Sequence, residues 1–129
     1  MATERRRRGS EAEQLAAEHL AARGWTVLAR NVAIGRDEID LLCVDTELPP
    51  ELVFVEVRSL RSVAFGAPEE RVDAAKVSRL YRSMAALRAL GHLPDGAVLP
   101  SLPVRVDLLI VDGRGASIEV RHLERLMPP

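Results

Sequence analysis

Two acidic residues lie within apolar segments that have the composition of buried β-strands. Asp40 belongs to the segment 37–44, and Glu56 follows sixteen positions later in the segment 52–58. An ionised carboxylate in such a strand requires a cation or hydrogen bonds to offset its loss of water. Two carboxylates on neighbouring strands, with the cationic Arg58 two residues past the second, are suited to holding a divalent metal ion against a phosphodiester.

The expected metal ligands are oxygen atoms, because Mg²⁺ and Mn²⁺ prefer them and Mg²⁺ keeps several of its own waters. We predict that Asp40 and Glu56 bind the metal through their carboxylates and that the Val57 carbonyl supplies a third oxygen. Strand parity places Arg58 on the same side as Glu56, towards the scissile phosphate. The structural alternative is that Glu56 and Arg58 simply pair at the end of a sheet.

Three other acids have both a functional and a structural interpretation. Glu13 lies on the helix face that meets the sheet, where it would orient a ligand or hold another metal. Its spacing from Ser10 is also that of a capping box. Glu38 is expected to form a solvent-facing ion pair, and Asp107 is expected to be a buried structural acid rather than a further member of the site.

Lys76 is the sole lysine, since the other 17 basic residues are arginines. It lies near the start of the longest predicted helix, which brings it towards the same end of the sheet as Glu56. A lysine amine can lose its proton when it is buried near other cations, whereas arginine cannot. We therefore predict that Lys76 supplies the amine that Arg58 does not provide; the alternative is that this lysine is retained by chance.

The composition excludes several classes of protein. At 129 residues and 47% apolar content, the chain is long enough for one domain with its own core. The single cysteine, Cys43, rules out an intramolecular disulfide and a cysteine-based zinc site. The sequence has no apolar run of about 20 residues, so no membrane partner is expected. Both observations predict a cytoplasmic protein. The net charge of −1 argues against a uniformly basic coat but permits a local basic patch. The three histidines show no ligand spacing.

The pattern of apolar residues predicts an α/β domain at 10–129, preceded by a flexible basic arm at 1–9. Helices are expected at 11–23, with Ser10 as N-cap, and at 69–90, and strands at 25–29, 37–44, 52–58, 104–111 and 116–121, with a turn or strand end at 31–35. Parity places Glu38, Asp40, Leu42 and Val44 on one face of the second strand, and Ile39, Leu41 and Cys43 on the other. This order indicates a mixed β-sheet with a helix against each face.

Beyond these patterns, the sequence resembles a known bacterial family. The residues that carry the resemblance are Glu13, Ala16, Leu20, Gly24, Asn31, Glu38-Ile39-Asp40-Leu41, Phe54-Val55-Glu56-Val57-Arg58, Gly66, Val72, Lys76 and Val106-Asp107. They resemble the YraN-like proteins of the restriction-endonuclease-like, PD-(D/E)xK, nuclease superfamily, which are similar to archaeal Holliday junction resolvases. The resemblance implies a three-layer sandwich fold, metal-dependent cleavage of DNA, branched or structured DNA as substrate, and a homodimer.

The resemblance also assigns roles and shows where this chain departs from the pattern. It implies that Asp40 and Glu56 are metal ligands, that position 58 holds the catalytic cation, and that Glu13 is the glutamate of the first helix. The usual glycine before Glu-Ile-Asp is Asp37, the usual lysine is Arg58, and the usual Thr-Arg is replaced by Ser59-Leu60. Arginine holds phosphate well but is a poor proton acceptor.

The expected function is therefore a metal-dependent endonuclease that acts on DNA. Backbone-positioning contacts to DNA are expected from Arg61, Arg71, Arg79, Arg82 and the basic arm. The first alternative is a DNA-binding module that has kept the fold and lost the chemistry, which Arg58 favours. The second is a protein-interaction domain, which would bind neither metal nor DNA.

Overall fold

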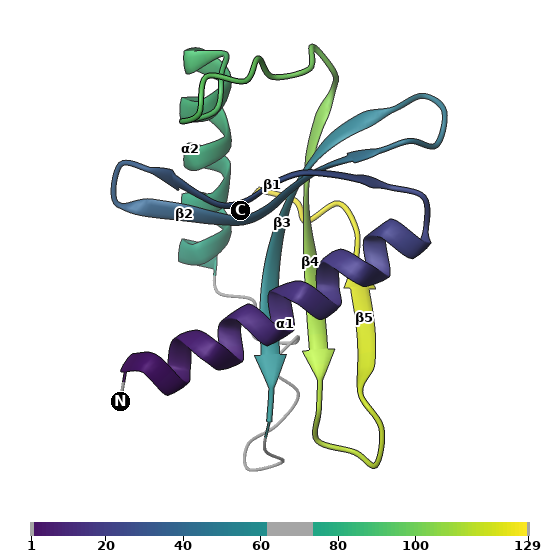
Figure 1. Cartoon of the computed structure of the whole chain (residues 1–129). Helices are drawn as coiled ribbons and strands as arrows, with labels where there is room; N and C mark the ends of the chain where they lie inside the picture. The colour runs from purple at the N-terminus through teal and green to yellow at the C-terminus, as the bar shows by residue number, and fades with distance from the viewer. Residues whose placement is uncertain (1, 62–73, 129) are drawn as a thin grey trace.

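The computed structural model describes residues 2–61 and 74–128, and of residues 2–10 it describes the backbone alone. These residues form an α/β fold whose elements are α1 (Ala2–Ala22), β1 (Thr26–Ile34), β2 (Asp37–Asp45), β3 (Glu51–Leu60), α2 (Ala74–Leu90), β4 (Val104–Asp112) and β5 (Glu119–Leu123). The five strands make one mixed sheet in the order β1-β2-β3-β4-β5 (Figure 1).

The strand directions follow from the connections. Neighbouring strands are antiparallel except β3 and β4, which are parallel. A parallel pair requires a crossover, and α2 lies in this one. The β2–β3 pairing runs from Leu41–Val55 to Asp45–Glu51, so Asp40 and Glu56 lie directly beyond the Leu41–Val55 pair, at one end of the ladder. Beyond them the β1–β2 hairpin turns away from the lower half of β3 (Figure 1).

Two apolar clusters hold one helix against each face of the sheet. Val53 and Val55 belong to the cluster that contains Ala16 and Leu20 of α1. The alternate residues of the same strand, such as Phe54, belong to the cluster that contains Leu80, Met84 and Leu87 of α2. Since successive residues of a strand point to opposite faces, α1 and α2 cover opposite faces of the sheet. The predicted α/β layering is confirmed.

Glycines end both helices. Gly24 has a φ of 92°, and the Gly24 and Trp25 amides donate to the carbonyls of Ala21 and Leu20, which is the Schellman arrangement. Gly91 has a φ of 76° and its amide donates to the Leu87 carbonyl. Both positive φ values lie in the left-handed region, where a side chain would be strained.

Several predicted boundaries are wrong. Helix α1 begins at Ala2 and its backbone continues through residues 2–10, so Ser10 is not an N-cap. The predicted turn at 31–35 largely belongs to β1, which continues to Ile34. Strand β5 spans 119–123 rather than 116–121, because residues 113–118 form the connection after β4. The predicted first turn of α2, residues 69–73, lies outside the described residues, as do Gly66 and Arg71.

The simple alternation predicted for β2 is also wrong. Ile39 packs with the cluster on the α2 side, whereas Leu41 packs on the α1 side. Along the β1–β2 ladder, Arg30 pairs with Leu41 and Val32 pairs with Ile39. Between these pairs Asn31 adopts a φ of 52°, a left-handed conformation that interrupts the regular ladder opposite Asp40.

Candidate active site

The Asp40 carboxylate and the Glu56 carboxylate lie at the fork where β2 leaves β3. The Val57 amide donates a hydrogen bond of 2.8 Å to Asp40 Oδ2, which ties the first acid to the strand of the second. Glu56 is buried and Asp40 is half-buried. The structure therefore brings together the two acids that sequence spacing alone had paired.

Burial and nearby negative charge disfavour the ionised form of the carboxyl groups at this fork. Burial, followed by the Glu56 charge, raises the pKa of Asp40 to about 8, against the lowering effect of the Val57 hydrogen bond. Burial also raises the pKa of Glu13, while a hydrogen bond to the Asn31 side chain opposes that shift. A carboxyl group held above its usual pKa by other carboxylates is one that a bound cation would return to its ionised form.

Three carboxylates from two elements converge beside the fork. Ligand oxygens of Glu13 on α1 and of Glu38 and Asp40 on β2 all lie within 4.8 Å of one another. Glu38, predicted to form only a solvent-facing ion pair, is exposed but belongs to this group. Glu13, whose capping role is excluded by the helical backbone at Ser10, is half-buried here. The irregular ladder at Asn31 accounts for the convergence, because Asn31 lies opposite Asp40 and its side chain hydrogen-bonds Glu13.

Lys76 reaches the fork from α2. Its Nζ lies 2.6 Å from Glu56 Oε1, and its side chain is 38% exposed whereas that of Glu56 is 10% exposed. This ion pair gives the buried Glu56 carboxylate the cation that its position requires. Arg58 is half-buried two residues further along β3, where it pairs in register with Ile110 of β4. The predicted role of the Val57 carbonyl as a metal ligand stays a prediction.

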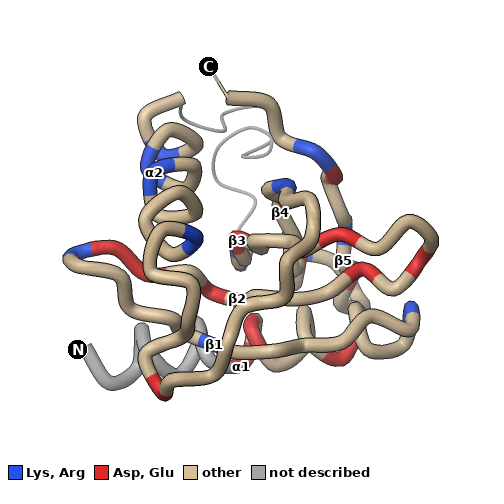
Figure 2. The backbone as a smooth tube through the Cα atoms, turned by 90° about the horizontal axis from the view of Figure 1, so that it is seen from above, with Lys and Arg blue, Asp and Glu red and all other residues tan. Residues whose placement is uncertain are grey.

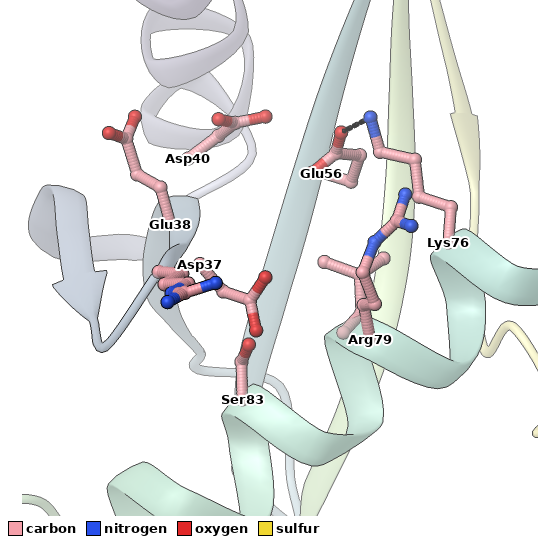
Figure 3. A pocket seen from close by; sticks show the side chains of 9 residues that line it. Asp37, Glu38, Asp40, Glu56, Lys76, Arg79 and Ser83 are labelled. Atoms are coloured by element: carbon pink, nitrogen blue, oxygen red, sulfur yellow. Dashed lines mark ion pairs between the residues drawn. The ribbon is translucent and has the colours of Figure 1, made fainter.

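These residues line a cleft of about 260 Å³ between the β1–β2 hairpin and α2. Its lining is Arg36, Asp37, Glu38, Asp40, Glu56, Lys76, Arg79, Leu80 and Ser83. Figure 3 shows the acids of β2 on one side, Lys76 and Arg79 on the other, and Glu56 between them. The cleft thus has an acidic interior with basic side chains at its borders.

Sequence reasoning missed Arg36, Asp37, Leu80 and Ser83 as members of this lining. Ser83 could have been found from helical spacing. It lies three or four residues after Leu80 and Arg79, which lie three or four residues after Lys76, and this places these side chains on one face of the helix. Arg36 could not have been found, since it lies in the turn of a hairpin whose length the sequence underestimated. Arg79, predicted as a DNA contact, lines the cleft.

Asp107 is a structural acid, as predicted, and belongs to a separate network. It is fully buried and accepts hydrogen bonds from Arg105, from the Arg125 amide and, at 2.7 Å, from His122 Nε2. These bonds lower the pKa of Asp107 despite its burial. His122, which shows no ligand spacing in the sequence, is part of this network. Ligand atoms of Asp107, His122 and Glu124 lie within 4.8 Å of one another, but the Arg105 guanidinium already donates a hydrogen bond to each of the two acids, so this group is a poor cation site.

Comparison with known proteins places the chain in a family. The family model described as "Uncharacterised protein family UPF0102" matches residues 12–111. The chain belongs to the UPF0102 family. A UPF0102 protein of Chlorobaculum tepidum is 37% identical over 117 residues, which is 91% of this chain and 82% of the relative. One of Symbiobacterium thermophilum is 42% identical over 108 residues, 83% of each chain.

The UPF0102 match includes every residue of the cleft and of the acidic group beside it, from Glu13 to Ser83. It confirms the YraN-like resemblance at the level of the family. Among the described helices, neither is long and apolar enough to cross a membrane.

Proposed function

We propose that this UPF0102 protein is a divalent-cation-dependent endonuclease that hydrolyses phosphodiester bonds in DNA. The observation that carries the proposal is the cleft in which Asp40 and Glu56 meet at a strand fork, with Lys76 beside them. Hydrolysis of a phosphodiester requires an activated water and positive charge at the phosphoryl oxygens. The helix–sheet–helix layering and the fork are compatible with the restriction-endonuclease-like fold implied by the resemblance.

The donor set suits a hard cation. Glu13, Glu38 and Asp40 offer carboxylate oxygens at mutual distances below 4.8 Å, and Glu56 lies at the same fork. Mg²⁺ and Mn²⁺ take such ligands and tolerate partial hydration. A divalent cation bound here would supply Lewis acidity and a more acidic bound water. Asp40 and Glu56 would hold it, and Glu13 would orient a ligand or water from the α1 side.

DNA would be bound through its phosphates, because the basic residues at the cleft surround an acidic interior. Arg36 and Arg79 border the cleft. Arg61 is exposed directly after β3, and Arg82 is exposed on α2. Arg71 lies outside the described residues. Such contacts position a nucleic acid without reading its sequence. Branched or structured DNA as substrate, and a homodimer as the active form, are extensions that rest on the resemblance to resolvases.

The proposal is tested by incubating the full chain with labelled single-stranded, duplex, flapped and four-way-junction DNA, with Mg²⁺, with Mn²⁺ or with EDTA. Asp40→Asn and Glu56→Gln keep the shape of each side chain and remove its charge. We expect cleavage of at least one substrate that requires the metal and is lost in both variants. Asp95→Asn, in the exposed loop between α2 and β4, is the matched control and retains cleavage.

The second candidate is a DNA-binding module of the same fold without catalysis, and Arg58 is the observation that favours it. If the protein binds these DNAs but cleaves none of them, the catalytic proposal is wrong and Arg58→Lys becomes the variant to examine. Binding of neither metal nor DNA would leave the protein-interaction domain as the interpretation.

A further inference from the structure

Lys76 occupies an unusual position for the only lysine of the chain. It is not on the strand that carries Glu56 but on α2, across the cleft, and its Nζ lies 2.6 Å from Glu56 Oε1. The pair is asymmetric, because the Glu56 side chain is 90% buried and fixed to the sheet, whereas the Lys76 side chain is more than a third exposed. Lysine has a long flexible stem, so its ammonium group can move while Glu56 stays in place.

We propose that Lys76 is the residue that contacts the substrate phosphate, and that Glu56 holds it in place until a divalent cation binds. The inference rests on the proposed function and adds a specific role for the helix residue. In the cation-free protein the ammonium group neutralises Glu56. The carboxylates of the fork would hold a divalent cation, whose charge would take over that neutralisation, and the Lys76 ammonium group would then contact a phosphate in the cleft.

The charges at the fork support this exchange. Glu13, Glu38, Asp40 and Glu56 place four carboxylates close together, and the ion pair with Glu56 ties Lys76 to them. A divalent cation and an ammonium group beside the same carboxylate repel each other, so each weakens the binding of the other. A bound phosphate favours the metal ion and the Lys76 ammonium group together, because its negative charge attracts both cations and offsets their mutual repulsion.

Arg58 is less well placed for this contact. The described residues that line the cleft include Lys76 and Arg79 of α2 but not Arg58. Arg58 lies next to β4, level with Ile110. The lysine role that the resemblance assigns to position 58 is therefore supplied, in this chain, from the neighbouring helix.

The proposal predicts effects of opposite sign on two ligands, which a purely structural ion pair would not give. Lys76→Gln removes the competing charge, so Mn²⁺ should bind on the order of tenfold more tightly, as measured by calorimetry without DNA. The same variant should bind a short labelled duplex more weakly in Ca²⁺, with the slope of log K against log salt reduced by about 0.9. Lys76→Arg should keep the wild-type slope.

Two controls separate the possible outcomes. Arg88→Gln makes the same change of charge on α2, but Arg88 lies about 18 Å along the helix from Lys76 and outside the cleft, so it should alter neither ligand. In a Glu56→Gln background, Lys76→Gln should still lower DNA affinity and slope. Loss of that effect would show that Lys76 serves only as the partner of Glu56 and would overturn the proposal.

The remaining outcomes distinguish this inference from the proposed function. If wild-type protein binds Mn²⁺ and DNA, but Lys76→Gln leaves both unchanged or weakens both, Lys76 does not contact phosphate and the proposed function still stands. If wild-type protein binds neither ligand, the proposed function is wrong and the role of Lys76 is wrong with it.

Discussion

Asp40 is the residue whose protonation state responds most directly to the architecture of the fork. Its pKa of about 8 lies well above the 3.8 of an ordinary aspartate, chiefly because of burial and the Glu56 charge. Between these two values the folded protein holds a proton that the unfolded chain has released. The stabilisation from this group is thus complete below about pH 4 and is lost as the pH rises through 8.

We predict that, in metal-free buffer, Asp40→Asn is more stable than the wild type at pH 7 to 8 by on the order of 1–3 kcal/mol, and that the difference shrinks towards pH 4. The asparagine keeps the shape of the side chain and cannot ionise. Urea unfolding of both proteins across this pH range measures the difference. If the free energies of unfolding of the two proteins change in parallel with pH, the pKa of Asp40 is not raised in the folded protein and the prediction is wrong. Saturating Mn²⁺ should reverse the order at pH 7, since only the aspartate binds the cation.

Arg105 is the residue on which the opposite end of the sheet depends. Its side chain is 5% exposed, and its guanidinium group pairs with Asp45, Glu51, Asp107 and Glu124 at 2.9–3.1 Å. It also lies 5.1 Å from the centre of the Trp25 ring. Removal of this one cation would leave two fully or nearly buried carboxylates without charge compensation.

Arg105→Met should therefore lower the free energy of unfolding by about 3–5 kcal/mol. The methionine fills much of the same volume, so the loss reports the charge rather than a cavity. Arg61→Met, which breaks the exposed 3.4 Å pair with Glu11, should cost less than about 1 kcal/mol. Chemical denaturation of the two variants at neutral pH gives the comparison, and equal losses would contradict the assigned role of the buried network.

At the scale of elements, the sequence predicted the elements with continuous apolar runs and missed those with local irregularities. Strands β2, β3 and β4 were located to within two residues, because each carries a run that only a covered strand explains. The continuation of β1 was missed, because Asn31 and Gly35 are typical of turns and the left-handed φ of Asn31 lies inside the strand.

The same difference between regular and irregular features determines which parts of the site the sequence predicted. Asp40 and Glu56 were paired correctly, because both acids interrupt apolar strands and a hairpin joins them. The convergence of Glu13 and Glu38 on Asp40 was not predictable from strand parity, since it depends on the irregular ladder at Asn31. The pairing of Lys76 with Glu56 depends on where α2 lies against the sheet, which helical periodicity does not determine.

Helix α1 approaches the sheet closely because the residues on its inner face are small. Ala12, Ala16 and Ala17 are at most 2% exposed and pack with Leu41, Val53 and Val55. Ala16→Leu should overpack this contact and lower the free energy of unfolding by about 1–3 kcal/mol. It should also displace Glu13, one turn away, and so reduce the rise in melting temperature produced by Mn²⁺. Ala21→Leu, on the exposed face, should change neither quantity.

Over the whole molecule, the charges are separated although their sum is only −1. Figure 2 shows basic segments along α2 and acidic segments along β2, and residues of both elements line the cleft. At the other end of the sheet, Arg105 pairs with Asp45 and Glu51, and Arg125 also pairs with Glu51. Among the described residues, Arg36 and Arg79 line the cleft, where a polyanion can reach them, and a modest number of phosphate contacts is expected there despite the acidic pI of about 6.3.

This distribution of charge predicts which arginines contribute to the salt dependence of DNA affinity. Arg36→Gln and Arg79→Gln, on opposite borders of the cleft, should each reduce the slope of log K against log salt by about 0.9, and together by about 1.8, because each removes one phosphate contact. Arg88→Gln, at the far end of α2, should leave the slope unchanged. Fluorescence anisotropy with a labelled duplex at several salt concentrations measures all four proteins against the wild type. A reduction confined to one border would mean that DNA lies along one wall of the cleft, whereas an equal effect of Arg88→Gln would contradict binding at the cleft.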